Sequence, residues 1–316
     1  MKHIDTNIGM VSNLCIGTAT FGWTASDRES LLILNASFEH GINFIDTADV
    51  YSRWVPGHAG GESETIVGSW LQHIQRDKVL VATKVFSRMG DGGTEGLSDM
   101  HITEAVENSL RRLQTDYIDL YQCHHFDYST PLEETCITMG RLIREGKIRH
   151  FGVSNFNGQQ LSDLLHICDR LGMPYPATIQ LKYNILQRSI ESDIFPILNR
   201  ILTIKLLPWS PLAGGVLTGK YNSDKKRPDS CRDVLFGKGW DDFAYSDRTQ
   251  RVLDKLFSME QYSGIPMAQI ALAYLYSKKE VASPIIGVSS VDQLLGLIPA
   301  ADRTLSTEEF CMLDGI

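Results

Sequence analysis

Short apolar runs alternate with longer amphipathic segments along almost the whole chain. Most of the runs are continuous rather than alternating, which is typical of parallel strands covered on both faces. We predict strands at residues 14–18, 43–48, 79–85, 117–123, 149–153, 178–181, 204–208 and 284–288. Strand–helix repeats at this spacing favour an α/β fold, a parallel (β/α)8 TIM barrel.

The segments between the predicted strands carry helix periodicity and helix-end signals. In residues 159–171 leucines recur three and four positions apart, and Gly172 marks the end of the helix. A second helix is predicted to start at Thr130. There Pro131 suits the first helical position and Glu133 completes a capping box.

The length of the chain fits one barrel domain with long loops at the carboxyl ends of its strands. A barrel takes about 250 residues, and the chain has 316 without a linker or low-complexity tract. We expect a single domain over residues 1–316, with residues 1–13 capping the barrel floor. The segments longer than ordinary loops are 52–61, 86–98 and 210–247. The last contains a basic cluster at 225–227 and is interpreted as an arm that covers a ligand.

Charge and composition exclude several classes of function. The net charge is -8, and the 30 Lys and Arg residues are scattered, so we expect no nucleic-acid or anionic-membrane partner. The apolar stretches are too short to span a bilayer, and MKHIDTNIGM has no apolar core of signal-peptide length. The 6 cysteines form no CxxC pair and are interpreted as reduced thiols. We therefore expect a cytoplasmic protein without a metal site.

Four polar side chains lie at or just beyond the ends of predicted strands: Asp46, Tyr51, Lys84 and His124. Any one alone is an ordinary cap, aromatic, surface charge or core imidazole. Together they are hard to explain in that way, because a buried ammonium and a buried carboxylate are each costly unless they pair. The simplest arrangement pairs Lys84 with Asp46 beneath the Tyr51 hydroxyl. Such a group could donate a proton to a carbonyl oxygen.

Two phosphate-binding patterns can be set aside. GGVLTGKY has the spacing of a nucleotidase loop, but Tyr221 stands where Ser or Thr would bind Mg²⁺. The first predicted strand is followed by GTATFGW, which does not fit G-x-G-x-x-G and argues against a Rossmann domain.

The stretches GINFIDTADVYS, VLVATKV, DYIDLYQCH, FGVSNF, IQLKYN and SPLAGGVLTGKY resemble, in order, the signatures of the aldo-keto reductase superfamily. The resemblance runs from Leu14 to about Val288. It implies a barrel that binds a nicotinamide dinucleotide in extended form and reduces a small carbonyl substrate. Tyr51 would be the proton donor and His124 would orient the substrate oxygen. Lys84, held by Asp46, is expected to lower the pKa of Tyr51.

The resemblance also implies cofactor contacts. Those near the nicotinamide end are Gly17, Thr18, Ser154, Asn155, Gln180 and Trp209, and those near the pyrophosphate are Ser210, Leu212, Gly214 and Lys220. At the adenosine end, Ser289 stands where the family often has a basic residue, and Gln293 follows it. A 2′-phosphate would be held there by serines and a helix start. NADPH is expected because most of the family uses it, and NADH remains an alternative.

The substrate pocket is expected to be aromatic, with walls from Trp23, Trp54, Phe86 and His125. Two other functions remain open. Potassium-channel β subunits share the resemblance, so the chain could be a dinucleotide-sensing subunit with negligible turnover. The third hypothesis is an unrelated barrel hydrolase or lyase that uses Asp46 and His124, which would need either a metal cluster or a Schiff-base pocket with Lys84 as its lysine.

Overall fold

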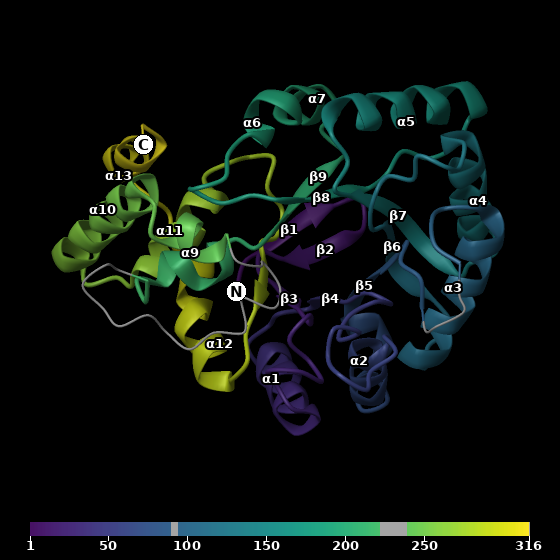
Figure 1. Ribbon diagram of the computed structural model, residues 1–316, viewed down its shortest axis with the longest axis horizontal. Helices are drawn as coiled ribbons and strands as arrows, with labels where there is room; N and C mark the ends of the chain where they lie inside the picture. The colour runs from purple at the N-terminus through teal and green to yellow at the C-terminus, as the bar shows by residue number, and fades with distance from the viewer. Residues whose placement is uncertain (90–93, 222–238, 316) are drawn as a thin grey trace.

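Parallel strands close into a barrel with helices around it (Figure 1). A computed structural model describes residues 1–89, 94–221 and 239–315, so the basic cluster at 225–227 lies outside the described residues. The barrel strands are β3 (Cys15–Gly17), β4 (Phe44–Asp46), β5 (Leu80–Val85), β6 (Ile118–Cys123), β7 (Ile148–Ser154), β8 (Thr178–Lys182), β9 (Lys205–Trp209) and β10 (Ile285–Gly287). They confirm all the predicted strands, and hence the predicted (β/α)8 fold.

The ring closes through the last strand. β10 pairs with β3, where Ile286 lies opposite Ile16, and also with β9, where Ile285 lies opposite Trp209. Because every barrel strand has neighbours on both sides, the carboxyl ends of all the strands meet at one end of the barrel.

The chain begins with an antiparallel hairpin, β1 (His3–Thr6) and β2 (Gly9–Ser12). Ile8 and Val11 are buried in a cluster with Cys15 and Phe44, the first residues of β3 and β4. The hairpin therefore packs against the amino ends of the strands, opposite the end where the strand-end polar residues lie.

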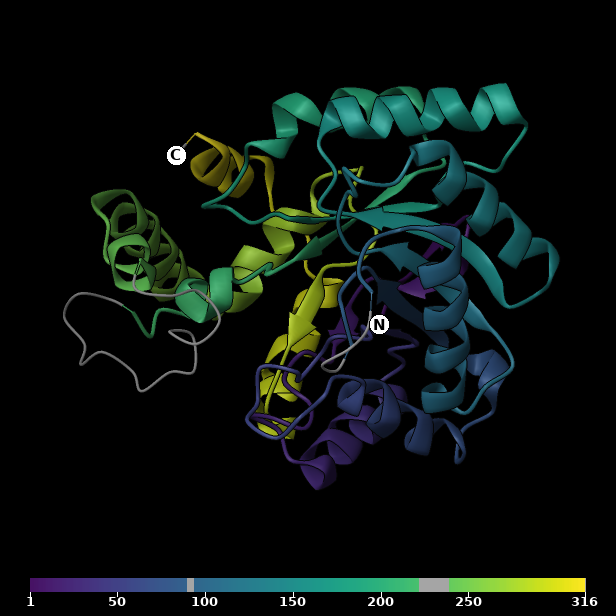
Figure 2. The same cartoon turned by 45° about the vertical axis from the view of Figure 1, so that its right-hand side comes forward.

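Helices and 3-10 turns follow the strands. The α-helices are α1 (Asp27–Glu39), α2 (Glu62–Leu71), α3 (Asp99–Leu113), α4 (Leu132–Arg144), α5 (Gly158–Leu171), α6 (Ile190–Asp193), α7 (Phe195–Arg200), α9 (Trp240–Ala244), α10 (Asp247–Ser263), α11 (Met267–Tyr276), α12 (Val291–Leu297) and α13 (Thr307–Asp314). The 3-10 segments are η1 (Arg76–Lys78), η2 (Ala213–Thr218) and η3 (Ile298–Asp302). Figure 2 shows α10 on the opposite side of the molecule from α3 and α4.

Helix ends follow local chemistry in α5 but not in α4. α5 begins with a capping box between Asn157 and Gln160 and ends at Gly172, whose φ of 61° suits glycine. The capping box predicted from Thr130 is wrong. α4 begins at Leu132 after Pro131 without a side-chain cap. The Glu133 carboxylate instead accepts a hydrogen bond from Arg170 of α5 at 2.6 Å.

Within the described residues, every helix is too short or too polar to cross a bilayer.

Candidate active site

An ion pair is buried at the carboxyl end of the barrel. Asp46 is the last residue of β4, and Lys84 is the last but one of β5. The Lys84 ammonium donates to Asp46 Oδ2 at 2.6 Å, to the carbonyl oxygen of Thr47 at 2.8 Å and to Tyr51 Oη at 3.0 Å. The side chains of Lys84 and Asp46 are 0% and 1% exposed. The predicted pairing beneath the Tyr51 hydroxyl is therefore present.

The hydrogen bonds fix the direction in which Tyr51 can donate. An ammonium has three N–H donors, and here each has an acceptor. The Tyr51 oxygen therefore accepts from Lys84, and its own proton is left for another acceptor. Tyr51 also lines a cavity, so that acceptor can be a bound molecule.

Two amides hold the far side of the Asp46 carboxylate. Oδ1 accepts from Gln180 Nε2 at 2.8 Å and from Gln122 Nε2 at 3.2 Å. Both glutamines are buried. A carboxylate that accepts this many hydrogen bonds in a low-dielectric site stays in place and keeps Lys84 oriented.

Lys84 lowers the pKa of Tyr51, as predicted, but the expectation that the resulting pKa falls below its usual value is wrong. Burial raises the pKa of Tyr51 more than the nearby Lys84 ammonium lowers it, and Asp46 raises it further. Burial lowers the pKa of Lys84, but Asp46 and Tyr51 together raise it above its usual value. The pair is therefore a neutral phenol beside a charged ammonium, and the ammonium stabilises any negative charge that forms on the phenol oxygen.

His124 follows β6 and faces Tyr51, with 6.1 Å between the ring centroids. Burial lowers the pKa of His124 well below its usual range, and Lys84 and His125 lower it further. Its Nδ1 atom is buried without a hydrogen-bond partner in the described part of the chain. A proton there would be a buried donor without an acceptor, so we assign it to Nε2. His124 is therefore a neutral imidazole that can donate from Nε2.

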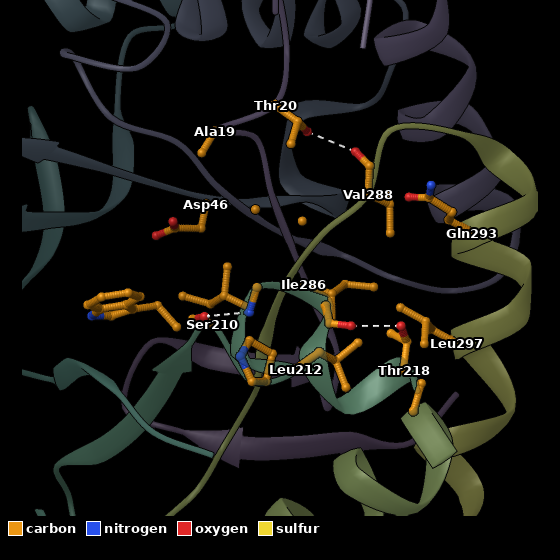
Figure 3. Close-up of a pocket in the computed structure, with 18 of the residues that line it drawn as sticks. Ala19, Thr20, Asp46, Ser210, Leu212, Thr218, Ile286, Val288, Gln293 and Leu297 are labelled. Carbon is orange, nitrogen blue, oxygen red and sulfur yellow. Dashed lines mark hydrogen bonds between the residues drawn. The ribbon is translucent and has the colours of Figure 1, made fainter. Parts of the chain in front are cut away.

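The cavity has a volume of about 770 Å³ and extends from the Tyr51 and His124 rings to helix α12. Figure 3 shows Asp46 toward one end of this cavity and Gln293 and Leu297 at the other. The predicted site residues that line it are Gly17, Trp23, Asp46, Tyr51, His124, His125, Ser154, Asn155, Gln180, Trp209, Ser210, Leu212, Gly214, Lys220 and Gln293. An elongated cavity with polar groups at both ends fits an extended ligand.

Some predicted site residues do not line the cavity. The Thr18 hydroxyl is buried, donating to the carbonyl oxygen of Asp46 at 3.1 Å and accepting from Ser63. The Trp54 ring packs against the rings of Trp23 and Tyr51, with 5.8 and 6.1 Å between the ring centroids. Phe86 packs on His125 at 5.3 Å in the same way. Trp54 and Phe86 therefore support rings that reach the cavity.

Polar side chains on neighbouring strand ends are linked above the ion pair. Asn155 Nδ2 donates to the carbonyl oxygen of His124 at 3.0 Å and to Ser154 Oγ at 3.2 Å. Trp209 Nε1 donates to Asn155 Oδ1 at 3.2 Å. Asn155 has a φ of 58°, a conformation that asparagine tolerates better than most residues. The network fixes the Trp209 ring at the cavity wall.

The segment after β9 exposes backbone to the cavity. Gly214 and Gly215 have φ values of 63° and 94°, and a Cβ atom on Gly215 would lie 2.9 Å from Nζ of Lys220. The ammonium of Lys220 thus lies next to the backbone of Gly215, which carries no side chain. That combination of a cation and a glycine-rich turn fits a phosphate group.

The end of the cavity that was expected to hold adenosine differs from the expectation. Gln293 Oε1 accepts from the backbone N–H of Ser289 at 3.0 Å and from its hydroxyl at 3.3 Å. The N–H of Val291 at the start of α12 donates to Glu29 of α1 at 3.2 Å. Ser289 does not line the cavity. A carboxylate therefore occupies the helix start that was expected to hold a phosphate.

Sequence reasoning missed several cavity residues. Thr20 donates to the carbonyl oxygen of Val288 at 2.8 Å and so joins two walls of the cavity (Figure 3). Glu260 of α10 and Met267 of α11 also line it. No local pattern marks Glu260 and Met267, because they reach the cavity only through the packing of helices far along the chain, whereas Thr20 lies in the loop just after β3.

Comparison with known proteins gives a consistent result. Residues 13–316 match the profile of the Aldo/keto reductase family. The chain is 34% identical to the uncharacterized oxidoreductase YrpG of Bacillus subtilis, over 97% of this chain and 92% of that protein. It is 34% identical to Protein tas of Escherichia coli, over 97% and 94%. It is also 34% identical to a probable voltage-gated potassium channel subunit beta of Arabidopsis thaliana, over 95% and 90%.

Proposed function

The chain belongs to the aldo/keto reductase family, and from that premise we propose that it is an NAD(P)H-dependent oxidoreductase that reduces an aldehyde or ketone to an alcohol. The observation that carries the proposal is the Lys84 ammonium, which donates at once to Asp46, Thr47 and Tyr51. It leaves the Tyr51 proton available at the wall of a large cavity.

The residues that would hold the cofactor fit it. The bare backbone at Gly214 and Gly215 with Lys220 suits the pyrophosphate. At the strand ends, Trp209 offers a ring face and Ser154 and Asn155 offer polar groups for a nicotinamide amide. The remaining cavity residues proposed to contact the dinucleotide are Gly17, Gln180, Ser210, Leu212 and Gln293. When bound, the reduced nicotinamide supplies a hydride to the carbonyl carbon.

The protein's part in the reaction is to bind the carbonyl oxygen and protonate it. Tyr51 donates its hydroxyl proton to the oxygen as negative charge develops there. Lys84, already donating to Tyr51 Oη, stabilises the phenolate that remains. His124 donates from Nε2 to the same oxygen and orients it. A phenol with a raised pKa can do this, because an alkoxide is far more basic than a phenolate.

The Schiff-base hypothesis for Lys84 is not supported. A Schiff-base lysine must lose its proton to attack a carbonyl carbon. Here Asp46 and Tyr51 raise the pKa of Lys84, and all of its protons are donated to neighbours. Lys84 is better suited to stabilise charge than to act as a nucleophile.

The similarity to a probable channel subunit beta keeps a second candidate open, a dinucleotide-sensing subunit with negligible turnover. A cytoplasmic location is also part of the proposal, supported by the free thiols of Cys15, Cys123, Cys136, Cys168 and Cys311. NADPH is proposed over NADH only because the family mostly uses it.

An absorbance assay at the reduced-nicotinamide band tests the proposal. Purified protein is mixed with NADPH or NADH and a panel of aldehydes, ketones and keto-sugars. We expect oxidation of at least one of the two cofactors that depends on the carbonyl. Tight dinucleotide binding without oxidation across the panel would instead support the sensing subunit.

A further inference from the structure

Two thiols outside the cavity lie against each other between neighbouring helices. Sγ of Cys136 on α4 and Sγ of Cys168 on α5 are 3.5 Å apart, and the two side chains are 1% and 0% exposed. Figure 1 shows α5 along the top of the molecule and α4 at the right, next to the end of α5. Neither residue lines the cavity, so the reduction proposed above does not use them.

We propose that Cys136 and Cys168 form a reversible disulfide that joins α4 to α5 when a peroxide is available as the oxidant. An S–S bond is about 2.05 Å long, so the sulfurs need to approach each other by roughly 1.5 Å. The helices already pack together and hold both thiols at contact distance. Closing the bond therefore requires side-chain and helix adjustments of that size.

The contact between the thiols also divides their roles. The hydrogen bond from Cys168 lowers the pKa of the Cys136 thiol, and the same contact, with burial, raises that of Cys168. The thiolate is the form of cysteine that reacts with peroxides. Cys136 is therefore the sulfur that is oxidised first, and Cys168 is the sulfur that resolves it.

The chemistry takes place in two steps. The Cys136 thiolate attacks one oxygen of hydrogen peroxide, the O–O bond breaks, and hydroxide leaves and takes up the proton that Cys136 lost, forming water. Cys136 is now a sulfenic acid. The Cys168 sulfur then attacks the Cys136 sulfur, the S–O bond breaks, and a second water leaves with the Cys168 proton. Two thiols have lost two electrons in all, and a thiol reductant reverses the change.

A third thiol is the competing partner. Cys123 is at the end of β6, and burial raises its pKa to about 12, with a further increase from nearby Cys136. The raised pKa does not separate Cys123 from Cys168, because burial and the contact with Cys136 also raise the pKa of Cys168. The 3.5 Å contact between the Cys136 and Cys168 sulfurs does separate them, so we expect Cys136 to pair with Cys168 and not with Cys123.

The disulfide would constrain a segment of the barrel that carries cavity residues. The chain between Cys136 and Cys168 contains β7, Ser154 and Asn155. Closing this segment restricts the unfolded chain and raises the free energy of unfolding. The observable consequence is a Tm that is several degrees higher for the oxidised protein than for the reduced protein.

Peptide mapping tests the pairing. The full chain is treated with hydrogen peroxide, its remaining thiols are alkylated, and it is digested with trypsin without reduction. Cleavage after Lys and Arg leaves Cys123 and Cys136 together in 113–141 and Cys168 in 150–170. We expect these two peptides to be cross-linked, lighter than their sum by two hydrogen atoms, and separated again by dithiothreitol.

Variants identify the sulfur involved. Cys123→Ser should keep both the cross-link and the rise in Tm, whereas Cys136→Ser and Cys168→Ser should lose both. The exposed Cys311 reports that the oxidant has acted. The proposal is overturned if Cys311 is oxidised while 113–141 and 150–170 remain separate. It is also overturned if the cross-link survives in Cys136→Ser. Neither result bears on carbonyl reduction, which is measured separately.

Discussion

The Lys84 ammonium donates to the Tyr51 hydroxyl across 3.0 Å, and its other two protons are taken by Asp46 and Thr47. All three protons of the Lys84 ammonium are therefore used in these hydrogen bonds, and none is left to transfer to a substrate. The phenol keeps its proton for an acceptor in the cavity. This relationship assigns proton donation to one residue and charge stabilisation to the other.

Replacing Tyr51 by Phe removes the donor while keeping the ring. We expect turnover to fall by about 10²–10⁴-fold, because proton donation by a positioned side chain contributes that much. Dinucleotide affinity, measured by fluorescence titration, should stay close to that of the wild type. Tyr128→Phe is the matched control, since Tyr128 is 87% exposed and lies outside the cavity. Near-normal turnover in Tyr51→Phe would show that another group is the donor.

Replacing Lys84 by Met separates the stability of the ion pair from its chemistry. The change leaves the Asp46 carboxylate buried without its cation, so the free energy of unfolding should fall by about 3–5 kcal/mol in urea titrations. Adding Asp46→Asn removes the stranded charge and should restore part of the loss. Turnover should stay low in both variants, because neither can stabilise charge on Tyr51. If Lys84→Met alone were as stable as the wild type, Lys84 and Asp46 would not form a buried ion pair.

The pH dependence of reduction follows from the same pKa directions. Burial lowers the pKa of His124 well below its usual range and raises that of Tyr51 above its usual value. Both groups therefore keep one protonation state across neutral pH. We expect the kcat/KM for carbonyl reduction to be flat between about pH 6.5 and 9.5. A fall near pH 7 or 8 in that profile would mean that one of the two assignments is wrong.

Much of the barrel and the ion pair could be predicted from sequence because each produces a recognisable local pattern of residues. A lysine or an aspartate inside an apolar run is tolerable only with a partner, so Lys84 and Asp46 imply each other from their sequence positions alone. The continuous runs that form β5 and β6 imply strands covered on both faces.

Other features depend on packing that no local pattern records. The pKa of Tyr51 rises because burial outweighs Lys84, and the extent of burial is set by the whole cavity wall. The Glu133 side chain accepts a hydrogen bond from Arg170 of the neighbouring helix α5 instead of capping the start of α4. The contact between Cys136 and Cys168 joins two helices in the same way.

Asp49 is a buried acid that the proposed chemistry does not use. It is 0% exposed, and neither carboxylate oxygen has a hydrogen-bond partner within the described residues. Burial raises its pKa well above its usual range, and the nearby Glu64 raises it further. Folding therefore disfavours the charged form of this side chain.

Asp49→Asn should stabilise the protein increasingly as pH rises. Because the folded pKa of Asp49 is raised, its contribution to stability is complete below the unfolded pKa of about 3.9 and is lost as pH rises through the folded value. Asparagine does not titrate, so the advantage of the variant should grow over that window, to about 1–3 kcal/mol where the wild-type carboxylate is charged. Urea titrations at several pH values measure the difference, with Asp254→Asn on the exposed face of α10 as the control. A difference that does not change with pH would mean that Asp49 titrates alike in the folded and unfolded protein.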